Sequence, residues 1–256
     1  MLSQEEMFRL VPEKLKEIEN AYGVDVLYAA ESGSRAWGFA SPDSDFDVRF
    51  IYKRKRDSYL QLNSPRDVIE LPIDDTWDVC GWDLDKTLKL LYKSNPTLYE
   101  WLGSSICYWK SGFEKRILPI AEEYFSLEKM LYHYLNTARH SIKDYLTGEE
   151  VRPKKYFYAL RPVLACEWIK EKHTVPPVLF DTLVKTVLPD SLDDDISRLL
   201  DLKMNGPEKM LITRVKAVDE YLSDRIRETD EYLNQLPKEK PGSWETLNKF
   251  FLSEIA

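Results

Sequence analysis

Residues 33–50 read GSRAWGFASPDSDFDVRF, a stretch that opens on a Gly-Ser turn, crosses a polar loop and ends in an alternating run. In that run charged residues alternate with apolar ones: Asp45, Asp47 and Arg49 with Phe46, Val48 and Phe50. Because successive side chains of a strand point to opposite faces, the charged residues share one surface and the apolar residues fill the other. The stretch therefore predicts a strand over 45–52 that carries two carboxylates and a cation above a packed face.

Two carboxylates this close repel each other unless positive charge lies between them. Mg²⁺ prefers carboxylate oxygens, keeps several waters and is commonly completed by the phosphates of a substrate. The turn at Gly33 and Ser34 offers backbone N–H groups and a hydroxyl that can bind such phosphates. We therefore interpret Asp45 and Asp47 as metal ligands beside a phosphate-binding turn. A solvated strand face next to an ordinary loop is the structural alternative.

The order of these parts resembles the DNA polymerase beta-like nucleotidyltransferase superfamily, in which a Gly-Ser turn precedes a D-x-D strand flanked by apolar residues. The full string over 33–50 is similar to one branch, the RNA repair pathway DNA polymerase beta family of predicted nucleotidyltransferases. The resemblance is strongest in the first half of the chain and continues into its helical remainder. It implies two-metal-ion transfer of NMP from an NTP to an acceptor hydroxyl, with Mg²⁺ or Mn²⁺. It also implies an RNA 3′ end, such as that of tRNA, as the acceptor.

In the superfamily a third acid stands on the strand beside the D-x-D strand. Asp78 lies in the middle of a predicted strand over 76–82, which follows another over 68–71, and it matches that position. Asp83 is the rival, but it directly precedes a predicted helix over 84–91 and is suited to cap it. The resemblance thus assigns the catalytic and metal-binding roles to Asp45, Asp47 and Asp78, with Asp83 as the alternative to Asp78.

The resemblance also implies residues that bind the nucleotide. Gly33 and Ser34 would hold the β- and γ-phosphates, while Arg35 and Arg49 would neutralise charge on the triphosphate or the acceptor. In the helical half, residues 154–162 read KKYFYALRP and resemble a K-K-x-x-Y-x-L-R-P string of the same family. Three of its residues recur at helical spacing and either contact the triphosphate or base, or form a solvated stripe: Lys154, Tyr158 and Arg161.

The chain of 256 residues carries a formal net charge of −8, which argues against binding of nucleic acid over a broad surface without sequence preference. Local basic segments remain at 53–56 and at Arg152, Lys154 and Lys155. The acidic total keeps two other functions open. One is nucleotidylation of a protein or small-molecule hydroxyl, and the other is a nucleotide-binding module without chemistry. The sequence favours no particular nucleobase or oligomeric state.

Cysteine usage and hydropathy favour a cytoplasmic protein without a membrane partner. The three cysteines, Cys80, Cys107 and Cys166, are widely spaced and fit neither a disulfide framework nor a zinc site. The three histidines form no metal-spaced pair. No apolar run is long enough to span a bilayer, and residues 1–6 lack the pattern of a signal peptide.

Periodicity predicts the α+β class. We expect a small mixed sheet, of nucleotidyltransferase type by the resemblance, with flanking helices in a catalytic domain over 1–112 and an all-helical domain over 113–256. Strands are expected over 24–30, 45–52, 68–71, 76–82 and 106–109. A helix capped by Ser3 should end near Gly23, and residues 53–62 form a polar stretch that is compatible with a helix. Further helices are expected over 35–39, 84–91, 97–102, 113–124, 127–146, 153–172, 177–186, 192–203, 207–236 and 243–255.

Overall fold

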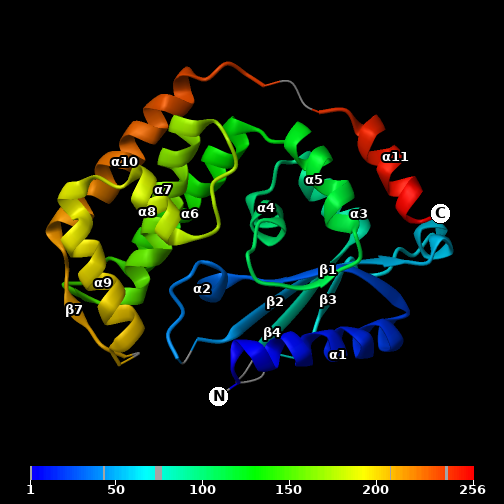
Figure 1. Cartoon of the computed structure of the whole chain (residues 1–256). Helices are drawn as coiled ribbons and strands as arrows, with labels where there is room; N and C mark the ends of the chain where they lie inside the picture. Colours follow the sequence, from blue (N-terminus) through cyan, green and yellow to red (C-terminus); the bar gives the residue numbers. More distant parts are fainter. Residues whose placement is uncertain (1, 43, 73–76, 208, 240–241) are drawn as a thin grey trace. The chain divides into compact units, whose positions relative to one another are not determined.

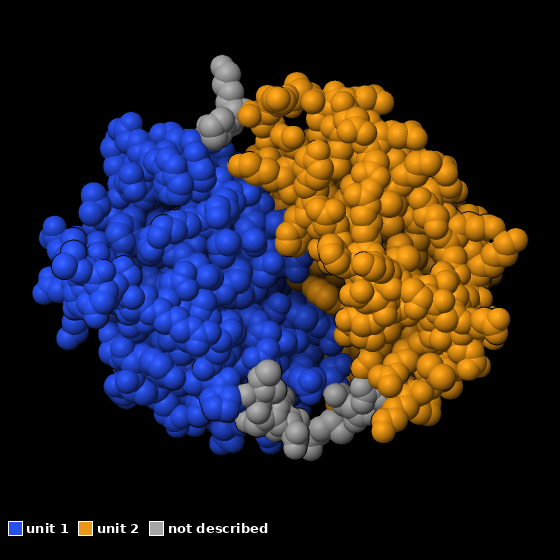
Figure 2. Space-filling model, turned by 180° about the vertical axis from the view of Figure 1, so that it is seen from behind, with its two compact units in different colours: residues 1–36, 44–124, 241–256 blue, residues 37–43, 125–240 orange. Residues whose placement is uncertain are grey.

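The computed structural model describes residues 2–42, 44–72, 77–207, 209–239 and 242–256. The protein is an α+β protein, as predicted, and its contacts divide it into two compact units. The sheet unit comprises residues 1–36, 44–124 and 241–256, and the helical unit comprises residues 37–43 and 125–240. Figure 1 labels the elements, and Figure 2 colours the two units on one face of the molecule.

A mixed five-stranded sheet forms the centre of the sheet unit, with strand order β3-β4-β2-β1-β5. The strands are β1 (Val24–Glu31), β2 (Phe46–Arg54), β3 (Val68–Glu70), β4 (Trp77–Asp83) and β5 (Cys107–Lys110). The pair β2–β4 is parallel and the other neighbours are antiparallel. The parallel pair places the D-x-D strand beside the strand that carries Asp78.

Helix α1 (Gln4–Tyr22) explains why one face of β2 is apolar. Ser3 and Glu6 form the capping box that starts α1, and Gly23 ends it in the left-handed conformation. Buried side chains of α1 share one core with the apolar positions of β2: Met7, Val11, Leu15 and Ile18 with Phe46, Val48 and Phe50. In Figure 1 helix α1 lies on one side of the sheet, and α3 (Leu84–Tyr92), α4 (Pro96–Leu102) and α5 (Phe113–Glu123) lie on the other.

Near the D-x-D strand one local prediction was wrong and another holds only in part. The helix expected over 35–39 is instead α2 (Gly33–Ala36), because Gly38 adopts a φ of +86° and residues 37–43 belong to the helical unit. The polar stretch over 53–62 is not an α-helix. Strand β2 continues to Arg54, paired with Val24 of β1, and only a 3-10 turn (Arg56–Leu60) follows.

The contacts divide the chain differently from the prediction, which placed a single domain boundary at residue 112. Helix α5 belongs to the sheet unit, where Phe113 and Ile117 are fully buried. The last helix, α11 (Trp244–Glu254), also belongs there. Its Glu254 accepts hydrogen bonds from Arg116 of α5, and Lys53 of β2 donates to the Glu254 carbonyl at 2.6 Å.

The helical unit contains α6 (Leu127–Tyr145), α7 (Pro153–Lys172), α8 (Phe180–Val187), α9 (Asp193–Asn205), α10 (Lys216–Gln235) and the short turn η2 (Asp190–Leu192). The single helix expected over 207–236 was wrong in its first part. Residues Ile212–Thr213 form β7, which pairs with β6 (Glu150–Val151), so α10 begins only at Lys216.

Residues 37–42 belong to the helical unit, and Phe39 lies in its core. Phe39 is 3% exposed, and its ring centroid lies 5.1 Å from that of Phe157 and 5.3 Å from that of Phe180. The Phe180 N–H donates to the Trp37 carbonyl at 2.9 Å. Over the ranges that the structure describes, no helix is both long and apolar enough to cross a membrane.

Candidate active site

A close approach between Gly33 and Asp47 joins the Gly-Ser turn to the D-x-D strand. The Ser32 N–H donates to the Asp47 carbonyl at 2.8 Å, which ties the turn to the strand. Gly33 has a φ of +58°, and a Cβ at that position would lie 2.1 Å from Asp47 Oδ2. Glycine alone satisfies both conditions, because it has no Cβ and adopts positive φ freely. The sequence motif is therefore a contact in space as well as an order in sequence.

Asp47 and Asp78 meet across the parallel pair, and Arg49 bridges them. The two aspartates are register partners on β2 and β4. Arg49 Nη2 lies 2.9 Å from Asp47 Oδ1 and 2.7 Å from Asp78 Oδ2. The side chains of Asp47 and Asp78 stay 30% and 33% exposed, so a ligand in solvent can reach both carboxylates. Asp47, Asp78 and Arg49 thus form a compact group of two acids and one cation, whereas the charged face predicted from the sequence consisted of Asp45, Asp47 and Arg49.

Asp45 lies just before β2 and is exposed. Arg35 fixes the backbone at this point: Nη2 donates to the Ser44 carbonyl at 2.7 Å and Nε to the Asp45 carbonyl at 3.2 Å. The Arg35 guanidinium carbon also lies 3.6 Å from the centroid of the Phe46 ring. Arg35 therefore orients the start of the D-x-D strand, a role that the sequence analysis did not predict for it.

In donor chemistry these residues fit Mg²⁺, because all three acids offer carboxylate oxygens and two of them converge on one cation. The arrangement of their side chains, however, is not that of a complete metal-binding site. In the described part of the chain, no three or more His, Cys, Asp or Glu side chains are placed together to hold a metal ion. The place between Asp47 and Asp78 already holds the Arg49 guanidinium. An ion at this pair would have to share these oxygens with Arg49 or displace it.

The electrostatics of Asp47 agree with a need for positive charge. Burial raises the pKa of Asp47 above its ordinary value, and Asp78 and Asp45 raise it further by repulsion, while Arg49 lowers it. The guanidinium groups of Arg49 and Arg35 both lower this pKa but do not offset the combined effect of burial and of the neighbouring carboxylates.

Comparison with known proteins covers almost the whole chain. The pattern of the RNA repair pathway DNA polymerase beta family matches residues 7–253. The chain belongs to this family. The resemblance seen in the sequence is thereby confirmed, and it extends through the helical half.

Two individual proteins show the range of similarity. The uncharacterized protein YcgL of Bacillus subtilis (strain 168) is 43% identical over 251 residues, which are 97% of this chain and 96% of that protein. A nucleotidyltransferase-like protein from Exiguobacterium sibiricum 255-15, known from its crystal structure, is 12% identical with a TM-score of 0.32. That match covers 86% of this chain and 73% of that one.

Within this family member, Asp78 and Asp83 occupy different environments. They are five positions apart on β4, an odd separation that puts their side chains on opposite faces of the strand. Asp83 is 3% exposed, accepts a hydrogen bond from the Asp85 N–H as the cap of α3, and pairs with Arg54 at 3.2 Å. Asp78 is therefore the acid that shares a face with Asp47, and Asp83 has the capping role that the sequence suggested.

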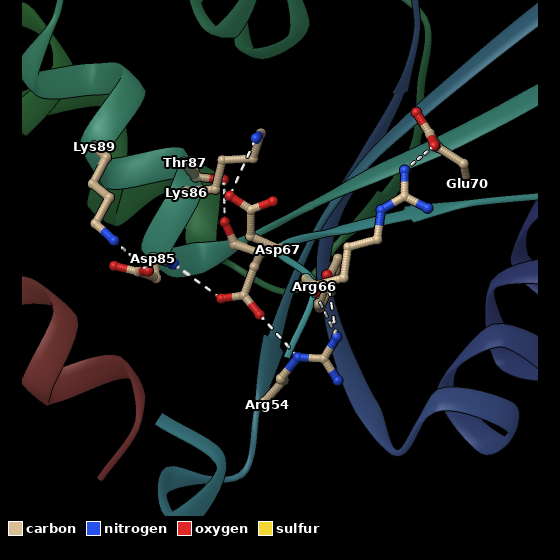
Figure 3. A network of polar contacts seen from close by, with 10 residues as sticks. Arg54, Arg66, Asp67, Glu70, Asp85, Lys86, Thr87 and Lys89 are labelled. Atoms are coloured by element: carbon tan, nitrogen blue, oxygen red, sulfur yellow. Dashed lines mark hydrogen bonds and ion pairs between the residues drawn. The ribbon is translucent and has the colours of Figure 1, made fainter. Parts of the chain in front are cut away.

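Figure 3 shows the polar contacts around the start of α3. Arg54 donates to the Arg66 carbonyl at 3.1 Å, Lys86 pairs with Asp67 at 3.2 Å, and Lys89 pairs with Asp85 at 2.7 Å. The first two contacts link the segment directly before β3 to β2 and to α3, and the third lies within α3. Asp74 and Asp75, expected in the turn between the two strands, lie outside the described residues.

The other predicted ligands differ in their surroundings. The Ser34 side chain is half-buried in α2, and its hydroxyl has no hydrogen-bond partner among the residues that the structure describes. Lys154 and Tyr158 are half-buried on α7 of the helical unit. Arg161 is only 4% exposed, and its guanidinium carbon lies 4.6 Å from the centroid of the Trp37 ring. Arg161 is thus part of a core, and a role for these α7 residues in the site stays a prediction.

Glu31 is a buried acid in contact with the candidate site that the sequence analysis did not single out. It is fully buried at the end of β1, and its Oε1 accepts a hydrogen bond from the Asp47 N–H at 2.6 Å. Its Oε2 accepts one from the Tyr108 hydroxyl, which in turn accepts one from Gln4 Nε2 at 3.0 Å. Burial raises the pKa of Glu31 to about 7. The available signal was an acid at the end of the apolar run VDVLYAAE, directly before the Gly-Ser turn.

Proposed function

We propose that this protein is a metal-dependent nucleotidyltransferase that transfers NMP from an NTP to the hydroxyl of an RNA 3′ end. One observation supports this proposal above the others. The Gly33 turn is in contact with the Asp47 carboxylate, and Asp47 is in register with Asp78 on the parallel neighbour. A phosphate-binding turn and two carboxylates on one surface suit a triphosphate and a cation together.

Each residue has a defined task in this reaction. The turn at Gly33 and Ser34 holds the β- and γ-phosphates, and Asp45, Asp47 and Asp78 would hold Mg²⁺ or Mn²⁺, which supplies positive charge for the triphosphate. The acceptor oxygen forms its bond to the α-phosphorus as the bond to the bridging oxygen breaks. Pyrophosphate leaves with the electron pair, and the hydroxyl proton passes to the Asp78 carboxylate.

The reaction can be tested with each α-labelled NTP, Mg²⁺ or Mn²⁺, and a short RNA or tRNA with a free 3′ hydroxyl. We expect label in the RNA with the wild-type protein and its loss, by a factor of at least 100, in Asp47→Asn. The matched control is Asp25→Asn, which changes an exposed acid on β1 of the same sheet. This variant should transfer label at the wild-type rate.

Other outcomes would decide against parts of the proposal. Label on the protein or on a small molecule, with none on RNA, would replace the acceptor and keep the transferase. Undiminished transfer by an Asp45→Asn, Asp47→Asn double variant would remove these residues from the reaction. NTP binding without transfer to any acceptor would leave a nucleotide-binding module.

A further inference from the structure

The helical unit carries a cluster of cations and phenol rings where α6 ends and α7 begins. We call it the α6–α7 cluster, and it consists of Tyr145, Arg152, Lys154, Lys155 and Tyr158. Lys155 is its centre. Its Nζ lies 3.5 Å from the ring centroid of Tyr145 and 4.8 Å from that of Tyr158. The two phenol rings, 6.0 Å apart, therefore hold the ammonium group in place by cation–π contact.

In the described part of the chain, the unpaired positive charge of this cluster lies on Arg152 and Lys155. Within the ranges that the structure describes, neither Arg152 nor Lys155 has a carboxylate at ion-pair distance. The neighbouring Glu149 and Glu150 are exposed and pair with neither cation. Burial lowers the pKa of Lys155, and the charges of Lys154 and Arg152 lower it further. A group of cations that repel one another on a chain of net charge −8 is costly unless an anion joins them.

The cluster continues into a polar hollow along α6. The hollow has a volume of about 380 Å³ and is lined by His133, Asn136, Thr137, His140, Ser141, Asp144 and Tyr145. Tyr145 belongs to both surfaces and so joins them. Among the lining residues only Asp144 carries negative charge. The others offer imidazole, amide and hydroxyl groups, which donate and accept hydrogen bonds. From residue 133 to residue 145 the helix rises about 18 Å.

We propose that the α6–α7 cluster and this hollow bind single-stranded RNA, with the cations on its phosphates and the tyrosines and polar groups on its bases and riboses. Cations interleaved with aromatic rings are the combination that single strands require. The length of the surface favours RNA over a free NTP, because about 18 Å spans several nucleotides while a triphosphate needs only a few cations. The inference builds on the proposed function, because it assigns the acceptor strand a place on the helical unit.

The test is the affinity of the full-length protein for a fluorescent 12-nucleotide RNA, measured by anisotropy at several salt concentrations. We expect the triple variant R152Q/K154Q/K155Q to bind at least tenfold more weakly than wild type in 50 mM salt, with a shallower salt dependence. The control is K185Q/K216Q/R227Q, with the same change of net charge. Each of these three cations is exposed and paired with an acid of its own helix. This control should bind RNA like wild type.

A second measurement needs no variant. Acetylation of lysines in the wild-type protein, followed by mass spectrometry, should be slowed by RNA at Lys155 and unchanged at Lys185. Equal affinity of the triple variant and the control, or unaltered acetylation of Lys155 in saturating RNA, would overturn the inference. So would protection of Lys155 by an NTP alone at the same phosphate concentration.

The RNA-binding experiments can fail or succeed independently of the nucleotidyl-transfer assay that tests the proposed function. Asp47→Asn should bind RNA as tightly as wild type, because Asp47 belongs to the sheet unit and not to this surface. RNA binding that depends on the cluster, without any nucleotidyl transfer, would support this inference and reject the proposed reaction. Transfer to RNA with no effect of the triple variant would do the reverse.

Discussion

At Gly33 the absence of a side chain sets how close the Gly-Ser turn comes to Asp47. Gly23 gives a matched comparison, because it also has a positive φ, +63°, but a Cβ there would meet nothing within 4 Å. An L-residue in this conformation costs about 1–2 kcal/mol. We expect Gly23→Ala to lose about that much free energy of unfolding and to keep its activity. Gly33→Ala should lose more stability and also its nucleotidyl transfer, because the added Cβ displaces the Asp47 carboxylate.

Urea unfolding and the labelled-NTP assay measure the two effects separately. Equal stability and equal activity of the two alanine variants would show that the contact between Gly33 and Asp47 has no consequence. Comparison of the two alanine variants therefore separates two contributions to the loss of stability. The backbone conformation contributes at both glycines, whereas the contact with Asp47 contributes only at Gly33.

Glu31 predicts how stability depends on pH. Its pKa rises from 4.5 to about 7 on folding because the side chain is buried. The folded state therefore keeps the proton where the unfolded state has lost it, so stability is fully present below pH 4.5 and falls as pH rises to about 7. The rise corresponds to an upper limit of about 3 kcal/mol. In EDTA, we expect wild type to lose free energy of unfolding between pH 5 and pH 8, relative to Glu31→Gln.

The glutamine variant serves as the reference because its amide cannot ionise and can still accept a hydrogen bond from the Asp47 N–H. Titrating groups that do not interact with Glu31 affect both proteins alike and cancel in the difference. A difference between the two proteins that stays constant from pH 5 to pH 8, measured by urea unfolding, would contradict a raised pKa at Glu31.

Strand β2 shows which structural features of an element can be predicted from its own residues. Its alternation predicted both faces correctly, because the period of two is local. The parallel pairing of Asp47 with Asp78 rests on long-range register between strands, for which the residues of β2 carry no signal. The family resemblance supplied that partner. The bridge of Arg49 between the two acids was not foreseen, because it depends on that register.

The same limit explains the error before α10. Residues 207–215 follow a helical pattern in part, but Ile212–Thr213 pair with β6, and the Arg214 N–H donates to the Glu149 carbonyl at 3.1 Å. Tertiary pairing overrode local propensity there. Glu31 was missed for a related reason. Its role requires Tyr108, which is 77 residues away in sequence.

The bridge across β2 and β4 predicts a response to metal. Arg49→Met removes the cation that pairs with both Asp47 and Asp78, so the two carboxylates repel each other more strongly. We expect the variant to unfold at a lower temperature than wild type in EDTA. Mg²⁺ should stabilise it more than it stabilises wild type, because the ion no longer competes with the guanidinium.

Arg54→Met is the control on the same strand. Arg54 pairs with the buried Asp83, which caps α3, so its loss should also lower the melting temperature. Mg²⁺ should give no extra stabilisation in that variant. Equal effects of Mg²⁺ on both variants would place the ion elsewhere than at the aspartate pair.

At the scale of the whole molecule, the chain leaves and re-enters each unit. Residues 37–43, which lie between the Gly-Ser turn and the D-x-D strand in the sequence, belong to the helical unit. The segments on either side of them belong to the sheet unit. The last helix, α11, returns to the sheet unit. Periodicity gives the class of each element, but it carries no information about which neighbour covers an apolar stripe. A single boundary at residue 112 followed from the change of period, and contacts divide the chain differently.

Two phenylalanines make this division testable. A cut at residue 112 puts Phe39 with the sheet and Phe113 with the helices, whereas the contacts assign them the other way round. Phe39 packs on Phe157 and Phe180, while the ring of Phe113 lies 5.9 Å from that of Phe250 in α11.

Each Phe→Ala change should cost about 3–5 kcal/mol in the unit that it belongs to. In native-state hydrogen exchange read by mass spectrometry, we therefore expect Phe39→Ala to speed exchange in α7 and α8 and to leave β1 unchanged. Phe113→Ala should speed exchange in β1 and α11 and spare α7. The opposite pattern would support the cut at residue 112, because the loss of protection follows the core from which the ring is removed.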